Sequence, residues 1–144
     1  MRDGLVSIIT PTFNSANFIE ETIKSVLSQT YSNWEMIIVD DCSGDNTEEV
    51  VSQYSRKDRR IKYIRLEKNS GAAIARNKAM GEAEGEYMAF LDSDDIWSAE
   101  KLSEQLSFMQ DHNIYLSCTD YEQINESGEK TGKIIKTLPK ASYN

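Results

Sequence analysis

Residues 36–54 read MIIVDDCSGDNTEEVVSQY, and this stretch contains the pattern that decides the fold. Its first residues, Met36–Val39, form a short continuous apolar run with the length of a fully buried strand. An acidic turn follows, and Asn46 with Glu49 resembles the capping box that begins a helix. Apolar residues then recur at helical spacing at Val50, Val51 and Tyr54. The stretch predicts one strand–loop–helix unit of an α/β protein.

The same unit repeats along the chain. Other apolar runs of strand length lie at Leu5–Ile9, Ile61–Leu66, Tyr87–Leu91 and Ile114–Leu116. Apolar residues at helical spacing separate them: Ile19, Ile23, Val26 and Leu27; Ala72, Ala75, Ala79, Met80 and Ala83; and Leu102, Leu106 and Met109. Asn17 with Glu20, and Ser98, predict two further helix starts. Near-continuous apolar strands separated by helices predict an α/β fold with a doubly wound, mostly parallel sheet, in which the alternating run at 61–66 lies near an edge.

The pattern weakens after Cys118, which is expected to be a buried small hydrophobe. Asn125–Gly128 is typical of a turn and predicts a hairpin that joins Tyr121–Ile124 to Lys133–Lys136. We therefore expect residues 1–120 to form one domain and residues 121–144 a hairpin-like extension or tail. The last part of the chain has little to bury, which indicates either a cut within a larger protein or a mobile tail.

Composition excludes several classes of protein. The chain has 144 residues, 24 acidic against 16 basic, and a net charge of −8, which argues against binding to a nucleic-acid backbone. One histidine and two distant cysteines, Cys42 and Cys118, cannot form a Cys/His zinc site. No apolar run approaches the roughly 20 residues of a membrane span or the h-region of a signal peptide. We expect a reduced, cytoplasmic, soluble domain.

Aspartates follow two of the predicted strands. In open α/β sheets, ligands bind beyond the carboxyl ends of the strands. Asp41 follows one strand, and Asp92 and Asp94 follow another, so carboxylates from both should meet at one edge. Like charges repel, and Mg²⁺ or Mn²⁺ carrying a diphosphate would neutralise them through oxygen ligands. Asp45 and Asp95 equally suit ordinary turn and capping roles.

Four motifs, in order and over about residues 5–120, are similar to those of the family 2 inverting glycosyltransferases of GT-A fold. They are Pro11-Thr12-Phe13-Asn14, Val39-Asp40-Asp41-x-Ser43-x-Asp45, Asn69-x-Gly71-x-x-x-Ala75-Arg76-Asn77, and Gly85-Glu86-Tyr87 running into Leu91-Asp92-Ser93-Asp94-Asp95. The resemblance implies a Rossmann-like half that binds a nucleotide-sugar, most often a UDP-sugar, with Mg²⁺ or Mn²⁺. It further implies a glycan or lipid-linked acceptor, and it is compatible with peripheral association at the inner face of a membrane.

The resemblance also assigns roles to residues. Thr10, Pro11, Thr12 and Phe13 would line the base and ribose, and Asp41 would accept a hydrogen bond from the uracil ring. Asp92 and Asp94, with Ser93 between them, would contact the ribose and the metal-bound diphosphate, with Asp95 as an alternative metal ligand. Gly71 to Arg76 would form the wall beside the base and the phosphates. Arg76 equally suits a role at the phosphates and an ion pair that holds the loops.

The sequence departs from the family pattern in two places. Cys42 stands where the family usually has glycine, and a positive φ there would strain a cysteine. The acidic catalytic base of the family lies in a second, acceptor-binding half. Glu122, Glu126 and Glu129 fall in the hairpin-like region and do not match it, so the base is expected beyond Asn144. The chain is expected to be the donor-binding part, truncated before the acceptor half and incomplete for turnover alone.

Two other functions remain open at this point. Metal-dependent phosphoryl transfer fits the acidic pairs in part, although Ser117-Cys118-Thr119 supplies no lysine to balance the phosphoryl charge. A nucleotide-sugar-binding module without catalysis also fits. Dinucleotide oxidoreduction is disfavoured because no G-x-G-x-x-G follows the first strand. The donor sugar and the oligomeric state do not follow from the sequence.

Overall fold

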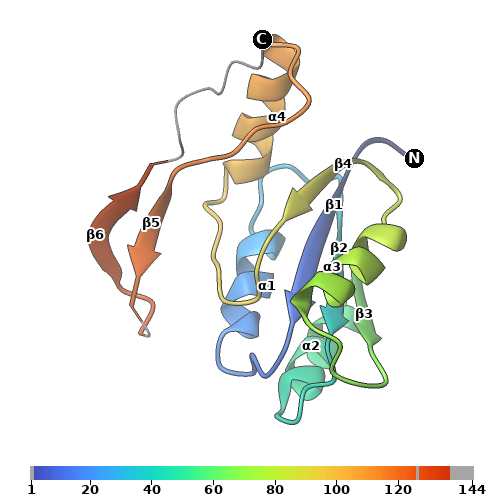
Figure 1. The fold of residues 1–144 in the computed structure, drawn as a ribbon. Helices are drawn as coiled ribbons and strands as arrows, with labels where there is room; N and C mark the ends of the chain where they lie inside the picture. The colour runs from blue at the N-terminus through green and yellow to red at the C-terminus, as the bar shows by residue number, and fades with distance from the viewer. Residues whose placement is uncertain (1, 126, 137–144) are drawn as a thin grey trace. The chain divides into compact units, whose positions relative to one another are not determined.

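The computed structural model describes residues 2–125 and 127–136, and the chain divides into two compact units, residues 1–104 and 105–144. Four parallel strands form the sheet of the first unit in the order β3-β2-β1-β4 (Figure 1). They are β1 (Arg2–Thr12), β2 (Trp34–Asp40), β3 (Ile61–Arg65) and β4 (Gly85–Phe90). The helices are α1 (Ile19–Leu27), α2 (Thr47–Ser55), α3 (Ala72–Gly81) and α4 (Lys101–Asp111), and the boundary between the units falls within α4.

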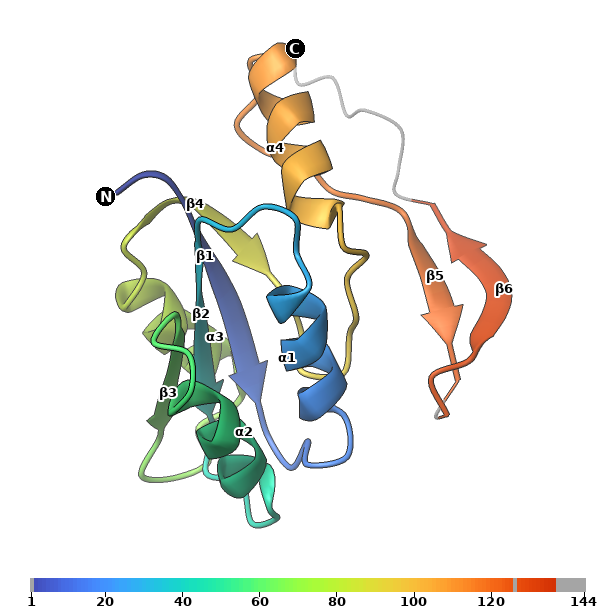
Figure 2. The same cartoon turned by 180° about the vertical axis from the view of Figure 1, so that it is seen from behind.

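Helices cover both faces of this sheet, as the apolar strands predicted. Figures 1 and 2 show α3 on one face and α1 with α2 on the other. On the α3 face, Ile9, Ile37 and Val39 pack with Ala75 and Ala79, and all five side chains are fully buried. The side chains on the opposite face of β1 and β2 are equally buried. Helices therefore enclose both sides of these two strands. The doubly wound α/β architecture is confirmed.

The two outer strands differ from each other. β3 lies at one edge, as its alternating sequence predicted. β4 lies at the other edge of the described sheet and has one uncovered face, although its near-continuous apolar sequence is typical of a strand buried on both faces. Met88 and Phe90 are 46% and 53% exposed. They lie beside Ser7 and Ile9 on the α3 face, and α3 packs on β1 and β2, so these two side chains stay uncovered.

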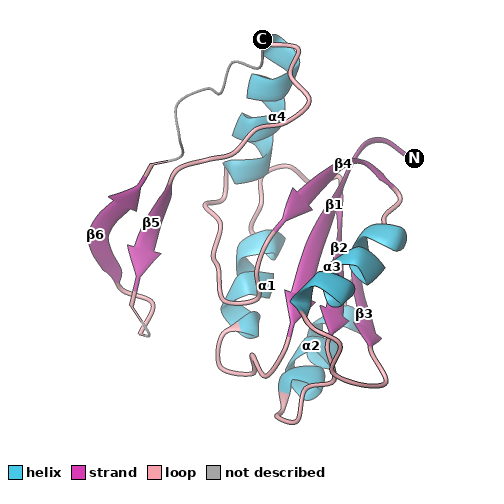
Figure 3. Cartoon of the chain, viewed as in Figure 1, coloured by secondary structure: helices cyan, strands magenta, loops and turns pink. Residues whose placement is uncertain are grey.

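The second unit contains the predicted hairpin, drawn as two strands in Figure 3. β5 (Tyr121–Ile124) pairs antiparallel with β6 (Lys130–Ile135). The expected fifth strand at Ile114–Leu116 is wrong: these residues are coil, and Leu116 is 88% exposed. An apolar run this short becomes a strand only beside a partner strand, and no described strand pairs with it. Cys118 is exposed as well, which corrects its expected burial.

The predicted capping boxes do not form. α1 begins two residues after Asn17, without a side-chain cap, so the Asn17–Glu20 box is wrong. Asn46 does precede α2, but its side chain makes no capping hydrogen bond. Asp45 takes over that role, because its Oδ1 accepts hydrogen bonds from the backbone N–H and the hydroxyl of Thr47 at 3.0 and 2.6 Å. The local role expected for Asp45 is confirmed.

α4 is capped from a distant part of the chain. The side-chain oxygen of Gln29 accepts the backbone N–H of Leu102 at 3.0 Å, and the side-chain nitrogen of Gln29 donates to the carbonyl of Ser98 at 2.7 Å. Ser98 therefore contributes its carbonyl to this arrangement.

Among the residues that the structure describes, no helix has both the length and the apolar character needed to cross a bilayer.

A charge network around the buried Glu35 joins the middle of β1 to the amino-terminal parts of β2, β3 and β4. The Glu35 carboxylate accepts hydrogen bonds from the Ser7 hydroxyl (2.6 Å) and the Glu84 backbone N–H (2.8 Å). It also forms an ion pair with Lys62 at 2.8 Å, and the Ser7 hydroxyl accepts the Gly85 N–H at 2.9 Å. Burial acts to raise the pKa of Glu35, but the bonds from Lys62, Ser7 and Glu84 outweigh it and hold that pKa below its usual value.

Replacing this carboxylate should destabilise the fold in a pH-dependent way. We expect Glu35→Gln to lower the free energy of unfolding at pH 7 by about 2 kcal/mol, since charge-assisted hydrogen bonds are lost. Because the folded-state pKa is lowered, the stabilisation is present above the unfolded pKa of a glutamate and disappears as pH falls through the folded value. The difference from wild type should therefore shrink in acid.

Urea unfolding followed by circular dichroism at several pH values measures this difference. The matched control is Glu21→Gln, at an exposed position of α1, which should stay within about 0.5 kcal/mol of wild type at each pH. A constant loss from neutral to acid pH would contradict the proposed ionisation of Glu35.

Candidate functional site

The loops that follow the parallel strands gather at one edge of the sheet, because all four strands run in the same direction. Figure 1 shows the arrowheads of β1, β2 and β3 at the same end, with the loops to α1, α2 and α3 beyond them. Most of the residues that the sequence predicts for the site lie in these loops or in the segment after β4. Ligands of open parallel sheets bind at this edge.

Asp41 ties three of these segments together. It is 3% exposed, and its two carboxylate oxygens accept the backbone N–H groups of Ser70 (2.6 Å) and Gly71 (2.7 Å). Its own N–H donates to the carbonyl of Thr12 at 2.9 Å. Gly71 precedes α3 with φ of 93°, a conformation that glycine adopts readily. A carboxylate offers about four acceptor positions, so Asp41 keeps acceptor capacity beyond these two bonds.

Asp40 is fully buried and anchors the turn that presents Asp41. It accepts hydrogen bonds from the Ser43 N–H (2.9 Å) and from the Tyr63 hydroxyl (2.6 Å), and it pairs with Arg65 at 3.3 Å. Burial and the adjacent Asp40 carboxylate raise the pKa of the Tyr63 phenol, which therefore stays protonated as a donor. The sequence pattern indicated acidity here but gave no sign of these partners.

Cys42 has the positive φ that was anticipated, 65°. Backbone strain of this kind costs on the order of 1–3 kcal/mol and persists where the surroundings fix the chain. Here the surroundings are Asp41 and Ser43, both held by the contacts above.

The loops after β1 and β2 are fastened to each other by four hydrogen bonds. The Asn14 N–H donates to the Ser43 hydroxyl, and the Asn14 side-chain oxygen accepts the Gly44 N–H, both at 2.8 Å. The Ser15 N–H donates to the Thr47 hydroxyl (2.9 Å), and the Ala16 N–H donates to Asp45 (3.0 Å). These bonds hold the loop after Phe13 in a fixed place beside Asp41.

The predicted residues 10–13 differ in their exposure. Thr10 is fully buried within β1, Pro11 and Thr12 are buried, and Phe13 is 48% exposed. The hydroxyls of Thr10 and Thr12 have no hydrogen-bond partner among the described residues. Buried polar groups are normally paired, so an unpaired hydroxyl at the last residue of β1 suits contact with a ligand or water.

Ser93 and its acidic neighbours differ in their exposure to solvent. Asp92 and Asp94 are exposed, whereas Ser93 between them is 8% exposed. The Ser93 hydroxyl hydrogen-bonds that of Ser15 at 2.9 Å, and the Ser93 carbonyl accepts the Thr22 hydroxyl at 3.0 Å. The sequence offered no signal for these contacts, since Ser15 and Thr22 precede Ser93 by 78 and 71 residues.

Arg76 forms an ion pair with Asp92 at 2.8 Å, which is one of the two roles expected for it. Arg76, Phe90, Asp92 and Asp95 line a pocket of about 390 Å³. Partial burial raises the pKa of Asp95, and the charges of Asp94 and Asp92 raise it further.

This concentration of like charge suits a bound cation. Asp92, Asp94 and Asp95 supply oxygen ligands of the kind that Mg²⁺ and Mn²⁺ accept, so the residues fit such an ion. Within residues 2–125 and 127–136, no three acidic, cysteine or histidine side chains are already arranged around a metal position. In this structure Arg76 balances one of the carboxylates instead.

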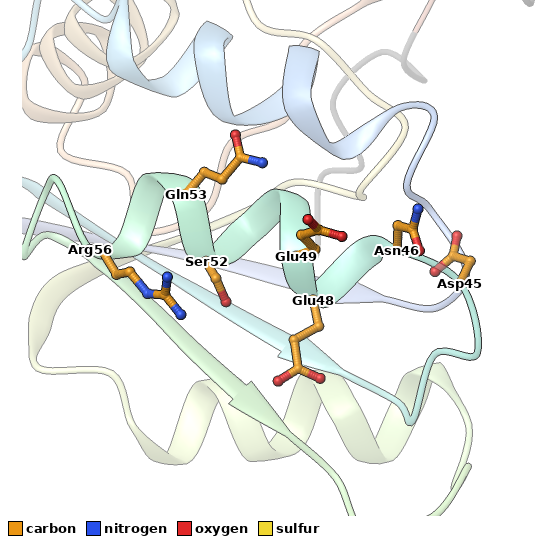
Figure 4. Close-up of a pocket in the computed structure, with 7 residues that line it drawn as sticks. All are labelled: Asp45, Asn46, Glu48, Glu49, Ser52, Gln53 and Arg56. Carbon is orange, nitrogen blue, oxygen red and sulfur yellow. The ribbon is translucent and has the colours of Figure 1, made fainter.

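A second, open pocket of about 420 Å³ lies along α2 (Figure 4). Its lining is Asp45, Asn46, Glu48, Glu49, Ser52, Gln53 and Arg56. Figure 4 shows these side chains spread along the outside of the helix from its N-terminus to its last turn. Glu48 is engaged by Arg65 at 3.2 Å, and only Asp45 of this set belongs to the predicted motifs. The pocket adds nothing to the candidate site.

Curated proteins similar to this chain are bacterial glycosyltransferases. TuaG of Bacillus subtilis, named as a teichuronic acid biosynthesis glycosyltransferase, is 48% identical over 140 residues, which is 97% of this chain and 56% of that protein. WfgD of Escherichia coli, named UDP-Glc:alpha-D-GlcNAc-diphosphoundecaprenol beta-1,3-glucosyltransferase, is 47% identical over 144 residues, 100% of this chain and 55% of that protein. The chain thus spans little more than half the length of these relatives.

Solved structures agree in fold. Staphylococcus aureus TarS residues 1–349 in complex with UDP matches with a TM-score of 0.71 and 39% identity, over 75% of this chain and 32% of that one. The Pyrobaculum calidifontis mannosyltransferase PcManGT in complex with GDP-Man and Mn²⁺ matches with a TM-score of 0.67 and 28% identity, over 72% and 32%. The family model described as "Glycosyl transferase family 2" matches residues 7–143. With this match and these relatives, the chain belongs to glycosyl transferase family 2.

Proposed function

We propose that this chain binds a UDP-sugar together with Mg²⁺ or Mn²⁺, for inverting transfer of the sugar to an acceptor hydroxyl. The observation that carries the proposal is the placement of Asp41 after β2 and of Asp92-Ser93-Asp94 after β4, in the loops at one edge of a parallel sheet. Support for the nucleotide comes from the TarS complexes with UDP and UDP-GlcNAc. The name of WfgD likewise specifies UDP-Glc.

The nucleoside would lie between the loops that Asp41 joins. An ionised carboxylate only accepts hydrogen bonds, and the unused acceptor positions of Asp41 suit the ring N–H of uracil. The unpaired hydroxyl of Thr12 and the half-exposed ring of Phe13 lie at the end of the neighbouring strand. Gly71 to Arg76 would form the adjoining wall, because Asp41 holds the start of α3 beside it.

Asp92, Asp94 and Asp95 would hold the metal ion. When bound, a divalent ion stabilises the negative charge that develops on the departing diphosphate. Arg76, now paired with Asp92, could then turn to a phosphate oxygen, since its side chain is about one-third exposed at 35%. A cation near Asp95 would also lower the pKa of this carboxyl, which Asp94 and Asp92 now raise.

Inverting transfer also needs a base that takes the proton from the acceptor hydroxyl as that oxygen attacks the anomeric carbon. Glu122 is paired with Lys130 at 2.9 Å in the hairpin, where it supports β5 and β6. We place the base outside residues 1–144, in agreement with the share of its relatives that this chain spans. The name of WfgD supports a lipid-linked acceptor, which would bring the protein to the inner face of a membrane.

The metal part of the proposal is tested by calorimetric titration of UDP into the chain with and without Mn²⁺. We expect Mn²⁺ to strengthen UDP binding. Asp94→Asn should reduce this strengthening by a factor of at least about ten, because replacing even a residue that only contacts a metal ligand changes metal affinity about 10–100-fold. Binding without Mn²⁺ should stay close to wild type. The matched control is Asp3→Asn, at an exposed position of β1. Equal binding with and without Mn²⁺ in the wild type would overturn the metal dependence.

The nucleoside part is tested by Asp41→Asn in the same titration. Loss of a charged acceptor costs about 1.5–3 kcal/mol, so UDP affinity should fall about tenfold or more. The loss should be the same with and without Mn²⁺, which separates Asp41 from Asp94. Circular dichroism must report an intact fold. Unchanged UDP affinity in a folded Asp41→Asn protein would remove Asp41 from the nucleotide site.

A further inference from the structure

We propose that Thr22 and Ser15 are positioning residues, which fix the Asp92-Ser93-Asp94 turn in the geometry that the metal-bound diphosphate requires. This inference rests on the proposed function. It concerns residues outside the acidic motif, in α1 and in the loop before it.

Both contacts converge on the residue between the two aspartates. The Thr22 hydroxyl donates to the Ser93 carbonyl at 3.0 Å, and the Ser15 and Ser93 hydroxyls lie 2.9 Å apart. Thr22 is fully buried and Ser15 is 8% exposed, so water does not compete strongly for these bonds. The middle of the turn is therefore held inside while Asp92 and Asp94 point outward.

The hydroxyl of Thr22 serves the turn in preference to its own helix. Serine and threonine hydroxyls within helices often bond the carbonyl three or four residues earlier. Ser25 and Ser28, in and just after α1, follow that rule and bond the carbonyls of Thr22 and Ser25 at 2.7 and 2.9 Å. Thr22 instead reaches a residue 71 positions away. A contact made across such a distance in sequence constrains the turn and adds little to α1 itself.

The turn is held from the other side as well. Arg76 of α3 pairs with Asp92 at 2.8 Å, and the Asp95 N–H donates to the Asp92 carbonyl at 3.1 Å. Binding of a metal and a phosphate requires carboxylates within about 0.5 Å of their working positions. If Arg76 leaves Asp92 for a phosphate, the contacts of Ser93 remain as the restraint that keeps Asp92 and Asp94 in place.

The test compares Thr22→Val, which keeps the shape but removes the hydroxyl, with Thr22→Ser, which keeps the hydroxyl. UDP is titrated into each protein with and without Mn²⁺. We expect Thr22→Val to reduce the strengthening by Mn²⁺ about tenfold, as for residues that orient metal ligands, and to change metal-free binding less than about twofold. Thr22→Ser should restore the strengthening. Ser15→Ala should act in the same direction.

Two controls separate positioning from general destabilisation. Ser7→Ala removes a buried hydroxyl from the network at the amino ends of the strands, and it should lower stability without altering the effect of Mn²⁺. Combining Thr22→Val with Asp94→Asn gives a double-mutant cycle. If Thr22 acts through the aspartates, the double variant should bind UDP like Asp94→Asn alone.

The outcomes distinguish this proposal from the proposed function. Equal binding with and without Mn²⁺ in the wild type would overturn the metal dependence in the proposed function, whatever the result for Thr22→Val. A normal wild type with an equally normal Thr22→Val would overturn the positioning role, as would additive losses in the double variant. If Thr22→Val does not fold, Ser15→Ala and Thr22→Ser provide the same comparison, and an unchanged Mn²⁺ effect in a folded Ser15→Ala protein would contradict the proposal.

Discussion

The bidentate use of the Asp41 carboxylate is the contact on which the loop edge of the sheet depends. One side chain at the end of β2 accepts the N–H groups of Ser70 and Gly71, while its backbone donates to Thr12. Three segments far apart in sequence are thereby held at fixed spacing at the loop edge of the sheet. Asp40 supports this arrangement from inside, because a buried carboxylate is tolerated only when its oxygens are fully engaged. Asp40 and Asp41 together therefore fix the positions of the loops that carry the candidate site.

The sequence predicted most of the first unit because its signals are strong and local. Fully apolar runs such as Met36–Val39 become inner strands, and the alanines of α3 allow the helix to lie close on them. The errors arise where the outcome depends on neighbours. The residues of β4 are apolar enough for a buried strand, but nothing in their pattern says that α3 stops short of Phe90. Ile114–Leu116 lacks a partner strand in the described part of the chain, and hydrophobicity does not supply one.

The residues of the candidate site likewise fall into those that could be predicted from the sequence and those that could not. The placement of Asp41 and Asp92-Ser93-Asp94 after strands was predictable, because apolar runs and the acidic residues that follow them are visible in the sequence. Ser15 and Thr22 were not, since each forms a hydrogen bond to Ser93, more than 70 positions away. Neither their type nor their spacing distinguishes them from ordinary polar residues of a loop or a helix. Arg76 stood between these cases: two roles fitted its position, and geometry favoured the ion pair in this structure.

The network around Glu35 lies at the end of the strands opposite the acidic loops. The residues that secure this end of the sheet are therefore separate from the candidate site, whereas Asp41 both holds the loops and belongs to that site. Substitutions of exposed loop side chains such as Phe13 and Asp94 then leave this network intact, while Glu35, Ser7 and Lys62 hold the sheet together. Such a separation lets exposed loop residues vary on one scaffold, and a substitution in the network around Glu35 is expected to act on the stability of the fold more than on the candidate site.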